Sequence, residues 1–204
     1  MHRKETKNLA ITAIFVAIFL LQTLIPNIGY IRILPTLPAV TTIPLTVAIY
    51  SLLMGPIAGT LFGIFWGIAR MVQAYTQPGD IVSLMLFQNF VIAVVPSVLA
   101  GFFPGMIGKF TAEKKSSVKE ISYTIAGAVT SLTNTAFVIL LTSLVFMGNS
   151  AKLLGHLGSF SQGTPLITAL IVALGLNGLV EAIFTAIVTP IIVTPLAKVL
   201  RRLG

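Results

Sequence analysis

Long apolar stretches alternate along the chain with short polar segments that are rich in turn-forming residues. A helix that crosses a membrane needs about 20 mostly apolar residues, and Gly, Pro and Asp mark the breaks between such helices. The pattern predicts six spans, over residues Leu9–Ile25, Ala39–Met54, 56–75, Ile81–Ile107, Ile121–Met147 and Pro165–Leu196. The outer loops are predicted at 26–38, 76–80 and 148–164. We therefore expect an all-α integral membrane protein, a six-transmembrane-helix bundle that forms a single domain over residues 1–204.

The composition supports a membrane protein. Hydrophobic residues make up 56% of the chain and charged residues 9%, against roughly 25% charged residues in soluble domains. The net charge of +8 would suggest a nucleic-acid partner in a soluble protein. Here the charges group at the predicted membrane borders, so no nucleic-acid partner is expected. The chain has no cysteine, which excludes disulfides and thiolate metal sites.

Most of the 13 lysines and arginines fall in three segments, residues 2–7, 109–119 and 198–202. Basic residues beside membrane spans stay on the cytoplasmic side, so both termini and the mid-chain loop are predicted to be cytoplasmic. Segments on the same side of the membrane must be separated by an even number of spans. The four spans before this loop and the two after it meet that requirement. The joint at Gly55-Pro56 carries no charge, and it is placed inside by this parity and by the sterics of proline. No small-x-small cleavage site follows Ile25, so the first apolar run is expected to remain as a span.

Small residues recur at every fourth position on two of the predicted spans. One stripe consists of Gly55, Gly59, Gly63 and Gly67, and the other of Asn89, Ala93, Ser97, Gly101 and Gly105. Small residues let membrane helices approach closely, because lipid offers no hydrophobic drive for helix association. We interpret both stripes as packing seams within the bundle. Ala13 and Ala17 in the first span form a single pair with the same spacing. This pair is weaker evidence, and it would indicate packing against a helix of a partner protein.

Charged side chains inside the apolar stretches are the first candidates for function. A charge at the centre of a membrane helix costs about 2.5–3.5 kcal/mol on insertion, so it normally faces a cavity or a partner. Arg70 follows Trp66 by four residues, and Glu181 follows Asn177 by four, so each pair shares a helix face. Arg70 could instead reach the outer interface beside Trp66. Glu181 could be protonated, bind a ligand hydroxyl or a cation, or form a helix-locking ion pair with Arg70.

Amides on two further spans complete the set of candidates: Gln88 and Asn89 in the fourth span, and Asn134 in the fifth. An amide both donates and accepts hydrogen bonds, and any one of them alone would be an ordinary interhelical bond. The polar positions on these four spans, the third to the sixth, all lie toward the outer halves of the predicted spans. We therefore predict that they share one pocket, which opens outward.

Enzyme signatures are missing from the sequence. There is no His-Glu-x-x-His, no Ser/His/Asp set and no paired acidic metal cluster in a span, while His2 is terminal and His156 lies in a predicted loop. No Walker phosphate loop is present either, so any use of ATP must come from another subunit. The sequence therefore predicts a protein that is not an enzyme and that needs no cofactor.

Taken together, these features resemble one membrane family. Six predicted spans in 204 residues, a basic loop after the fourth, Ala13-x-x-x-Ala17 and Gly55-Pro56-x-Ala58-Gly59 resemble the substrate-binding S component of energy-coupling factor (ECF) vitamin transporters. The resemblance covers essentially the whole chain. It implies a subunit that binds one micronutrient in a pocket near the outer surface, capped by outer loops. It also implies partners, a transmembrane T subunit and two ATPases, on which the S component topples within the bilayer. The family's alanine motif docks on the T subunit, a role carried here to Ala13 and Ala17.

Within that family, the stretches 28–35 and 65–89 look most like the pantothenate-specific members, through Trp66-x-x-x-Arg70 and the segment Gln77-Pro78-Gly79-Asp80. The resemblance implies that Arg70 pairs with the carboxylate of pantothenate through charge-assisted hydrogen bonds. The remaining candidates would serve the amide and hydroxyls of pantothenate (Gln88, Asn89, Asn134 and Asn177) or its carbon skeleton (Trp66 and Tyr75). The role of Glu181 stays open.

Other functions are compatible with the same residues. Riboflavin, folate, biotin or a pyridoxine-like ligand would keep the transporter class, although the single tryptophan disfavours a flavin stacked between several rings. A membrane scaffold, whose polar residues only lock helices together, would bind no small molecule. A membrane enzyme is disfavoured by the missing motifs. The expected location is a bacterial cell membrane, with multiple passes of the chain through the lipid bilayer.

Overall fold

The computed structural model describes residues 2–25, 28–31, 40–77, 81–157 and 163–202, and the fold within them is almost entirely helical. The helices of this part that are long and apolar enough to cross a membrane are α1 (His2–Leu24), α3 (Pro56–Thr76), α5 (Phe90–Thr111), α6 (Ser116–Val145) and α8 (Leu166–Arg202). The shorter elements are β1 (Tyr30–Ile31), β2 (Val40–Thr41), α2 (Ile43–Met54), α4 (Ile81–Phe87), the 3₁₀ turn η1 (Met147–Asn149) and α7 (Ser150–Leu157). The all-α fold is therefore confirmed, and five of the six predicted spans correspond to helices of the described part that are long and apolar enough to cross a membrane.

Helix α2 lies in the middle of the bundle and is shorter than the predicted span Ala39–Met54. Its 12 residues extend over about 18 Å at 1.5 Å per residue, against about 30 Å of membrane hydrocarbon. Every residue from Pro44 to Ser51 is buried, and α2 packs against α1, α3, α5, α6 and α8. A helix that is apolar on all sides belongs in a core. Residues 40–41 ahead of it form β2, which pairs antiparallel with β1.

The apolar run 81–107 is not one helix, so the prediction of a single span there is wrong. Helices α4 and α5 are separated at residues 88–89. The side-chain oxygen of Asn89 accepts hydrogen bonds from the backbone N–H groups of Val91 at 3.0 Å and Ile92 at 3.4 Å. This is an N-cap, which satisfies donors that the first turn of a helix leaves free. Asn89 therefore starts α5 instead of pointing into a pocket.

Helix α8 also departs from its predicted bounds. It continues through Pro190 and Pro195, where interruptions were expected, and ends at Arg202. Proline removes one backbone hydrogen bond of a helix, but membrane helices tolerate it where their neighbours satisfy the freed groups. The basic residues 198–202 are consequently part of the helix.

The two small-residue stripes meet in a close seam between α3 and α5. A Cβ atom on Gly59 would clash with the carbonyl oxygen of Gly101, and one on Gly63 would clash with that of Ser97. Because the clashing atoms belong to the backbone, side chains at these positions would push the two helices apart. The prediction that the stripes are packing seams is thus confirmed for their central residues. Gly127 allows a similar approach of α6 to α8.

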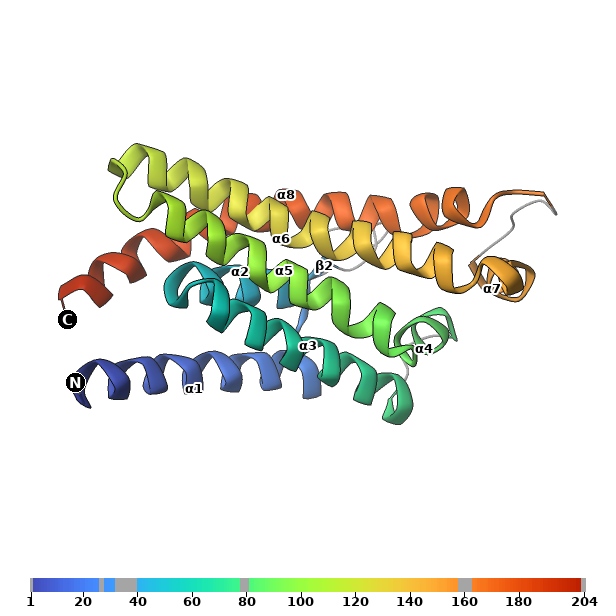
Figure 1. Ribbon diagram of the computed structural model, residues 1–204, viewed down its shortest axis with the longest axis horizontal. Helices are drawn as coiled ribbons and strands as arrows, with labels where there is room; N and C mark the ends of the chain where they lie inside the picture. Colours follow the sequence, from blue (N-terminus) through green and yellow to red (C-terminus); the bar gives the residue numbers. More distant parts are fainter. Residues whose placement is uncertain (1, 26–27, 32–39, 78–80, 158–162, 203–204) are drawn as a thin grey trace.

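Both termini lie at one end of the bundle together with the turn between α5 and α6, whereas α4 and α7 lie at the other end (Figure 1). Helix α1 runs along one edge (Figure 1). Polar contacts tie it to the bundle: Lys7 Nζ donates to the carbonyl oxygen of Leu200, and the hydroxyls of Thr12 and Tyr50 are 3.0 Å apart. The predicted outer loop 148–164 contains α7 and all but the first residue of η1. Residues 26–27, 32–39, 78–80 and 158–162 of the predicted outer loops and their borders lie outside the described residues.

Candidate functional site

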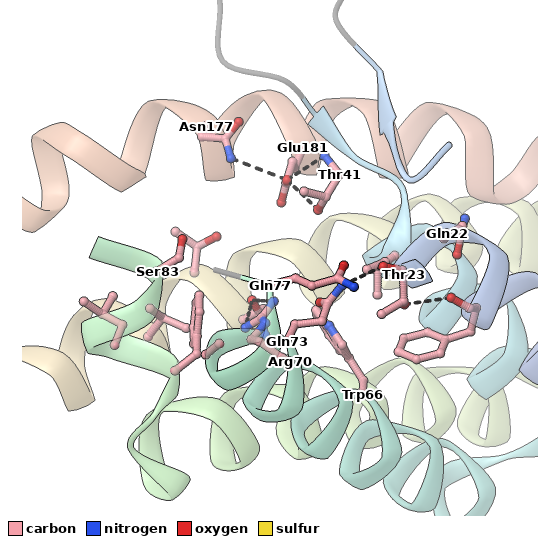
Figure 2. Close-up of a pocket in the computed structure, with 18 of the residues that line it drawn as sticks. Gln22, Thr23, Thr41, Trp66, Arg70, Gln73, Gln77, Ser83, Asn177 and Glu181 are labelled. Carbon is pink, nitrogen blue, oxygen red and sulfur yellow. Dashed lines mark hydrogen bonds between the residues drawn. The ribbon is translucent and has the colours of Figure 1, made fainter. Parts of the chain in front are cut away.

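A cavity with a volume of about 710 Å³ lies at the end of the bundle away from the chain termini. Its walls come from the C-terminal ends of α1 and α3, from α4 and β2, and from the adjoining parts of α6 and α8. Ligand sites typically measure about 300–1,000 Å³ and place a few polar groups among apolar side chains. The cavity matches this description, with polar side chains from several elements directed into one space (Figure 2).

Arg70 is held in the cavity wall by aromatic rings. Its guanidinium carbon lies 4.6 Å from the ring centroid of Trp66 and 4.5 Å from that of Phe87, and each contact is a cation–π attraction. Trp66 is only 1% exposed, so the indole cannot move aside without disturbing the core. Both terminal nitrogens of Arg70 also donate to Asn134 Oδ1, at 3.3 and 3.4 Å. A guanidinium stacked on rings presents its in-plane N–H groups to a carboxylate, in the fork geometry that such a ligand needs.

Glu181 lies on the α8 wall of the same cavity. Its Oε1 accepts hydrogen bonds from the backbone N–H of Thr41 at 2.8 Å, from the Thr41 hydroxyl at 2.7 Å and from Asn177 Nδ2 at 3.5 Å. Within the described residues Glu181 has no ion-pair partner. The helix-locking ion pair with Arg70 is therefore absent from that part of the chain, and the carboxylate joins β2 to α8 (Figure 2).

Hydrogen bonds also close the cavity on the side of α1. Gln22 Nε2 donates to the Thr42 hydroxyl at 2.9 Å, and the Thr46 hydroxyl donates to Gln22 Oε1 at 2.9 Å. Gln73 Nε2 on α3 donates to the carbonyl oxygen of Thr23 at 2.6 Å. An amide that bonds through both its nitrogen and its oxygen, as Gln22 does, resists rotation, and the Gln73 bond adds α3 to the wall that α1 and α2 form beside Arg70.

Five of the eight residues predicted to bind a ligand line the cavity: Trp66, Arg70, Asn134, Asn177 and Glu181. These five residues come from α3, α6 and α8. Three of the four helices predicted to contribute polar residues to the pocket therefore do so. The other three residues lie outside the lining. Asn89 caps α5, and Tyr75, which is 63% exposed, donates its hydroxyl to the backbone carbonyl of Gln88 at 3.4 Å.

Several lining residues were not predicted, and they share no single sequence signal. They are Gln22 and Thr23 on α1, Thr41 in β2, Gln73 and Gln77 in or after α3, and Ser83 and Phe87 on α4. Gln73 and Gln77 could have been found, because they follow Arg70 by three and seven residues and thus share its helix face. Thr41 and Phe87 could not, because only the folded chain brings β2 to α8 and α4 to α3.

Two buried amide atoms beside the cavity have no hydrogen-bond partner in the described part of the chain: Asn134 Nδ2 and Asn177 Oδ1. One is a donor and the other an acceptor. A buried polar atom without a partner costs about 1–3 kcal/mol. Both atoms are closed to the cavity, whereas the side chains that carry them belong to its lining.

Ala13 and Ala17 are exposed on α1 and lie one turn apart, outside the cavity lining. Large apolar side chains continue the same exposed surface, including Ile14 and Leu21. The face therefore offers small residues within an apolar border, which suits lipid or a second helix.

The chain matches a family described as the ECF transporter, substrate-specific component, over residues 7–193. It is also 40% identical over 149 residues to the "Pantothenate transporter PanT" of Leuconostoc mesenteroides subsp. mesenteroides, and the alignment covers 72% of each chain. Members of this family are multi-pass membrane proteins that serve transport, not enzymes. The family match extends from α1 into α8 and includes every helix that lines the cavity. The chain therefore belongs to the family of substrate-binding S components of ECF transporters.

Proposed function

We propose that the chain is the pantothenate-binding subunit of an ATP-driven ECF importer. The observation that carries the proposal is Arg70, a cation held by Trp66 and Phe87 inside a cavity of ligand size. An anchored guanidinium is suited to a ligand with a single carboxylate. The relative named as a pantothenate transporter supports this choice of substrate.

The cavity offers a partner for each kind of polar group in pantothenate, which has a carboxylate, an amide and two hydroxyls. Arg70 binds the carboxylate through its in-plane N–H groups. Asn134 and Asn177, whose side chains both line the cavity, are the amides that serve the amide and hydroxyls of the ligand. Phe87, which is half-buried in the lining, covers the carbon skeleton, whereas the buried Trp66 supports Arg70 from behind. The proposed contacts rest on residues of the lining, and not on Tyr75, Gln88 or Asn89.

The chain crosses the membrane six times, and both termini are cytoplasmic. Helix α2 supplies the sixth crossing, with the strand pair completing its passage on the outer side. The segments 2–7, 109–119 and 198–202 lie toward the end of the bundle that holds the termini (Figure 1), and basic residues favour the cytoplasmic side. This orientation turns the cavity outward, toward the arriving vitamin.

The partners are those of the family, a transmembrane T subunit and two ATPases. The chain has no Walker motif of its own, so ATP is used by the partner subunits. The face of α1 that carries Ala13 and Ala17 docks on the T subunit. Its small side chains allow the close helix approach that packing within lipid requires.

The test is the thermal stability of the detergent-purified chain, measured with pantothenate, riboflavin, folate, biotin and pyridoxine in turn. A ligand that binds only the folded state raises stability by mass action, by about 2.7 kcal/mol at a hundredfold excess over its dissociation constant. We expect a rise in melting temperature with pantothenate alone. A rise with another vitamin would keep the transport function and replace the substrate. If a folded sample free of co-purified ligand responds to no vitamin, the scaffold function is favoured instead.

A further inference from the structure

The carboxylate of Glu181 is used unequally by its protein neighbours. All three hydrogen bonds that it receives end on Oε1. The other oxygen, Oε2, receives none from the described residues, yet it is not among the fully buried unpartnered atoms. Figure 2 shows Glu181 projecting from α8 toward the space in front of Gln73 and Arg70. Oε2 is thus an open acceptor in the cavity wall.

This asymmetry separates two tasks within one side chain. A carboxylate has about two lone-pair sites on each oxygen, so three donors leave Oε1 no capacity for a ligand. They also determine the direction of the group, because Thr41 binds through both its backbone and its side chain. Oε2 keeps its full accepting capacity, and Glu181 as a whole is only 7% exposed.

We propose that Glu181 Oε2 accepts a hydrogen bond from a ligand hydroxyl, and that Glu181 thereby determines specificity for a hydroxylated monocarboxylate. The inference rests on the proposed function, since it takes Arg70 as the partner of the ligand carboxylate. Glu181 then receives the other end of the molecule, which in pantothenate carries the hydroxyls. A site built to bind a hydroxyl rejects an analogue that lacks it, because its own polar group loses its partner.

The same charge excludes a second class of ligands. A dicarboxylate would bring one of its acidic groups against Oε2, where like charges repel at short range and low exposure. Arg70 can neutralise one ligand carboxylate, and the described cavity lining contains no other lysine or arginine. Glu181 therefore selects for hydroxyl donors and against a second acid.

The experiment is a calorimetric titration of the purified chain with pantothenate and with each of its two deoxy analogues, in which one hydroxyl is replaced by hydrogen. A hydrogen bond to a charged group corresponds to at least about a tenfold change in dissociation constant. We expect that loss for one of the two analogues with the wild-type chain. If both analogues bind the wild-type chain within about twofold of pantothenate, far below what a charged hydrogen bond gives, the proposal is overturned without any variant.

Glu181→Gln tests the residue itself. Its amide oxygen replaces Oε1 against the donors of Thr41, and its NH₂ group then takes the place of Oε2, so the bond to β2 is kept while the acceptor becomes a donor. We expect weaker binding of pantothenate and a deoxy-to-native ratio of dissociation constants near one. An unchanged ratio would mean that Glu181 only joins β2 to α8, and would overturn the assignment.

Two further variants serve as controls. Thr41→Val removes the hydroxyl donor to Oε1 but leaves Oε2 in place, so it should weaken all three ligands by the same factor and preserve the wild-type ratio. Glu120→Gln makes the same chemical change at an exposed glutamate on α6, and should alter nothing. If the wild-type chain binds no pantothenate, the proposed function fails together with this inference. If it binds with the ratio unaffected by Glu181→Gln, the inference alone fails.

Discussion

At the scale of single residues, the site consists of charges that the fold orients before a ligand arrives. Arg70 is held by Trp66, Phe87 and Asn134, and Glu181 is held by Thr41. Burying charges in a membrane protein is costly, and it is compensated where the charges meet partners. Side chains that are already oriented lose less conformational entropy on binding. The arrangement favours a ligand whose polar groups match these positions.

Arg70→Ala should weaken pantothenate binding by about 1.5–3 kcal/mol, the usual contribution of a hydrogen bond to a charged group. Arg70→Lys keeps the charge but loses the planar fork and most of the stacking on Trp66 and Phe87. We expect the affinity of Arg70→Lys for pantothenate to lie between the affinities of Arg70→Ala and the wild-type chain. Calorimetric titration measures the affinities of both variants. Lys109→Ala is the control, because Lys109 is an exposed cation in the last turn of α5 and lies outside the cavity lining. Equal affinity of Arg70→Ala and wild type would remove Arg70 from the site.

The residue types explain which parts of the site could be predicted from the sequence. Arg70 and Glu181 are visible as charges, and Asn134 as an amide, because such groups are rare within apolar spans. Thr41 and Phe87 are ordinary residues of membrane proteins, and their roles come from contacts between elements distant in the sequence. Asn89 has the residue type expected of a ligand contact, yet the backbone N–H groups of α5 take up its side-chain oxygen.

At the scale of elements, small residues determine how closely α3, which carries Arg70, packs into the bundle. The Gly59 and Gly63 positions bring α3 against α5, and their four-residue spacing made this seam predictable. The bounds of α2 and α4 were not predictable, because an apolar run does not reveal whether lipid or protein surrounds it. Helix α2 is enclosed by its neighbours, and α4 ends where Asn89 caps the next helix.

The face of α1 gives a prediction that separates docking from binding. Ala13→Trp should abolish vitamin uptake by cells that also produce the T subunit and both ATPases, because the added bulk blocks helix approach. Pantothenate binding by the purified variant should be unchanged, since Ala13 lies outside the cavity lining. Ala151→Trp on the exposed surface of α7 is the control and should leave both properties intact. Loss of binding together with uptake would contradict this division, because it would make α1 at Ala13 part of the pocket.

At the scale of the whole molecule, the bundle places its two functions at different positions. The cavity lies at the end away from the termini, and the proposed docking face follows the outer side of α1. The elements in between are closely packed through α2, which contacts most of the other helices. Binding at the cavity can therefore be measured on the isolated chain, whereas transport requires the partner subunits.

The most direct test of the central claim is a calorimetric titration of pantothenate into the wild-type chain, Ser83→Trp and Ser117→Trp. Ser83 is half-buried in the cavity lining, whereas Ser117 is exposed at the opposite end of the bundle. We predict saturable binding of one pantothenate per chain for the wild type and Ser117→Trp, and weakened binding for Ser83→Trp, because the indole takes up part of the cavity. Undiminished binding by Ser83→Trp would place the vitamin elsewhere, and absence of binding to the wild-type chain would contradict the proposed substrate.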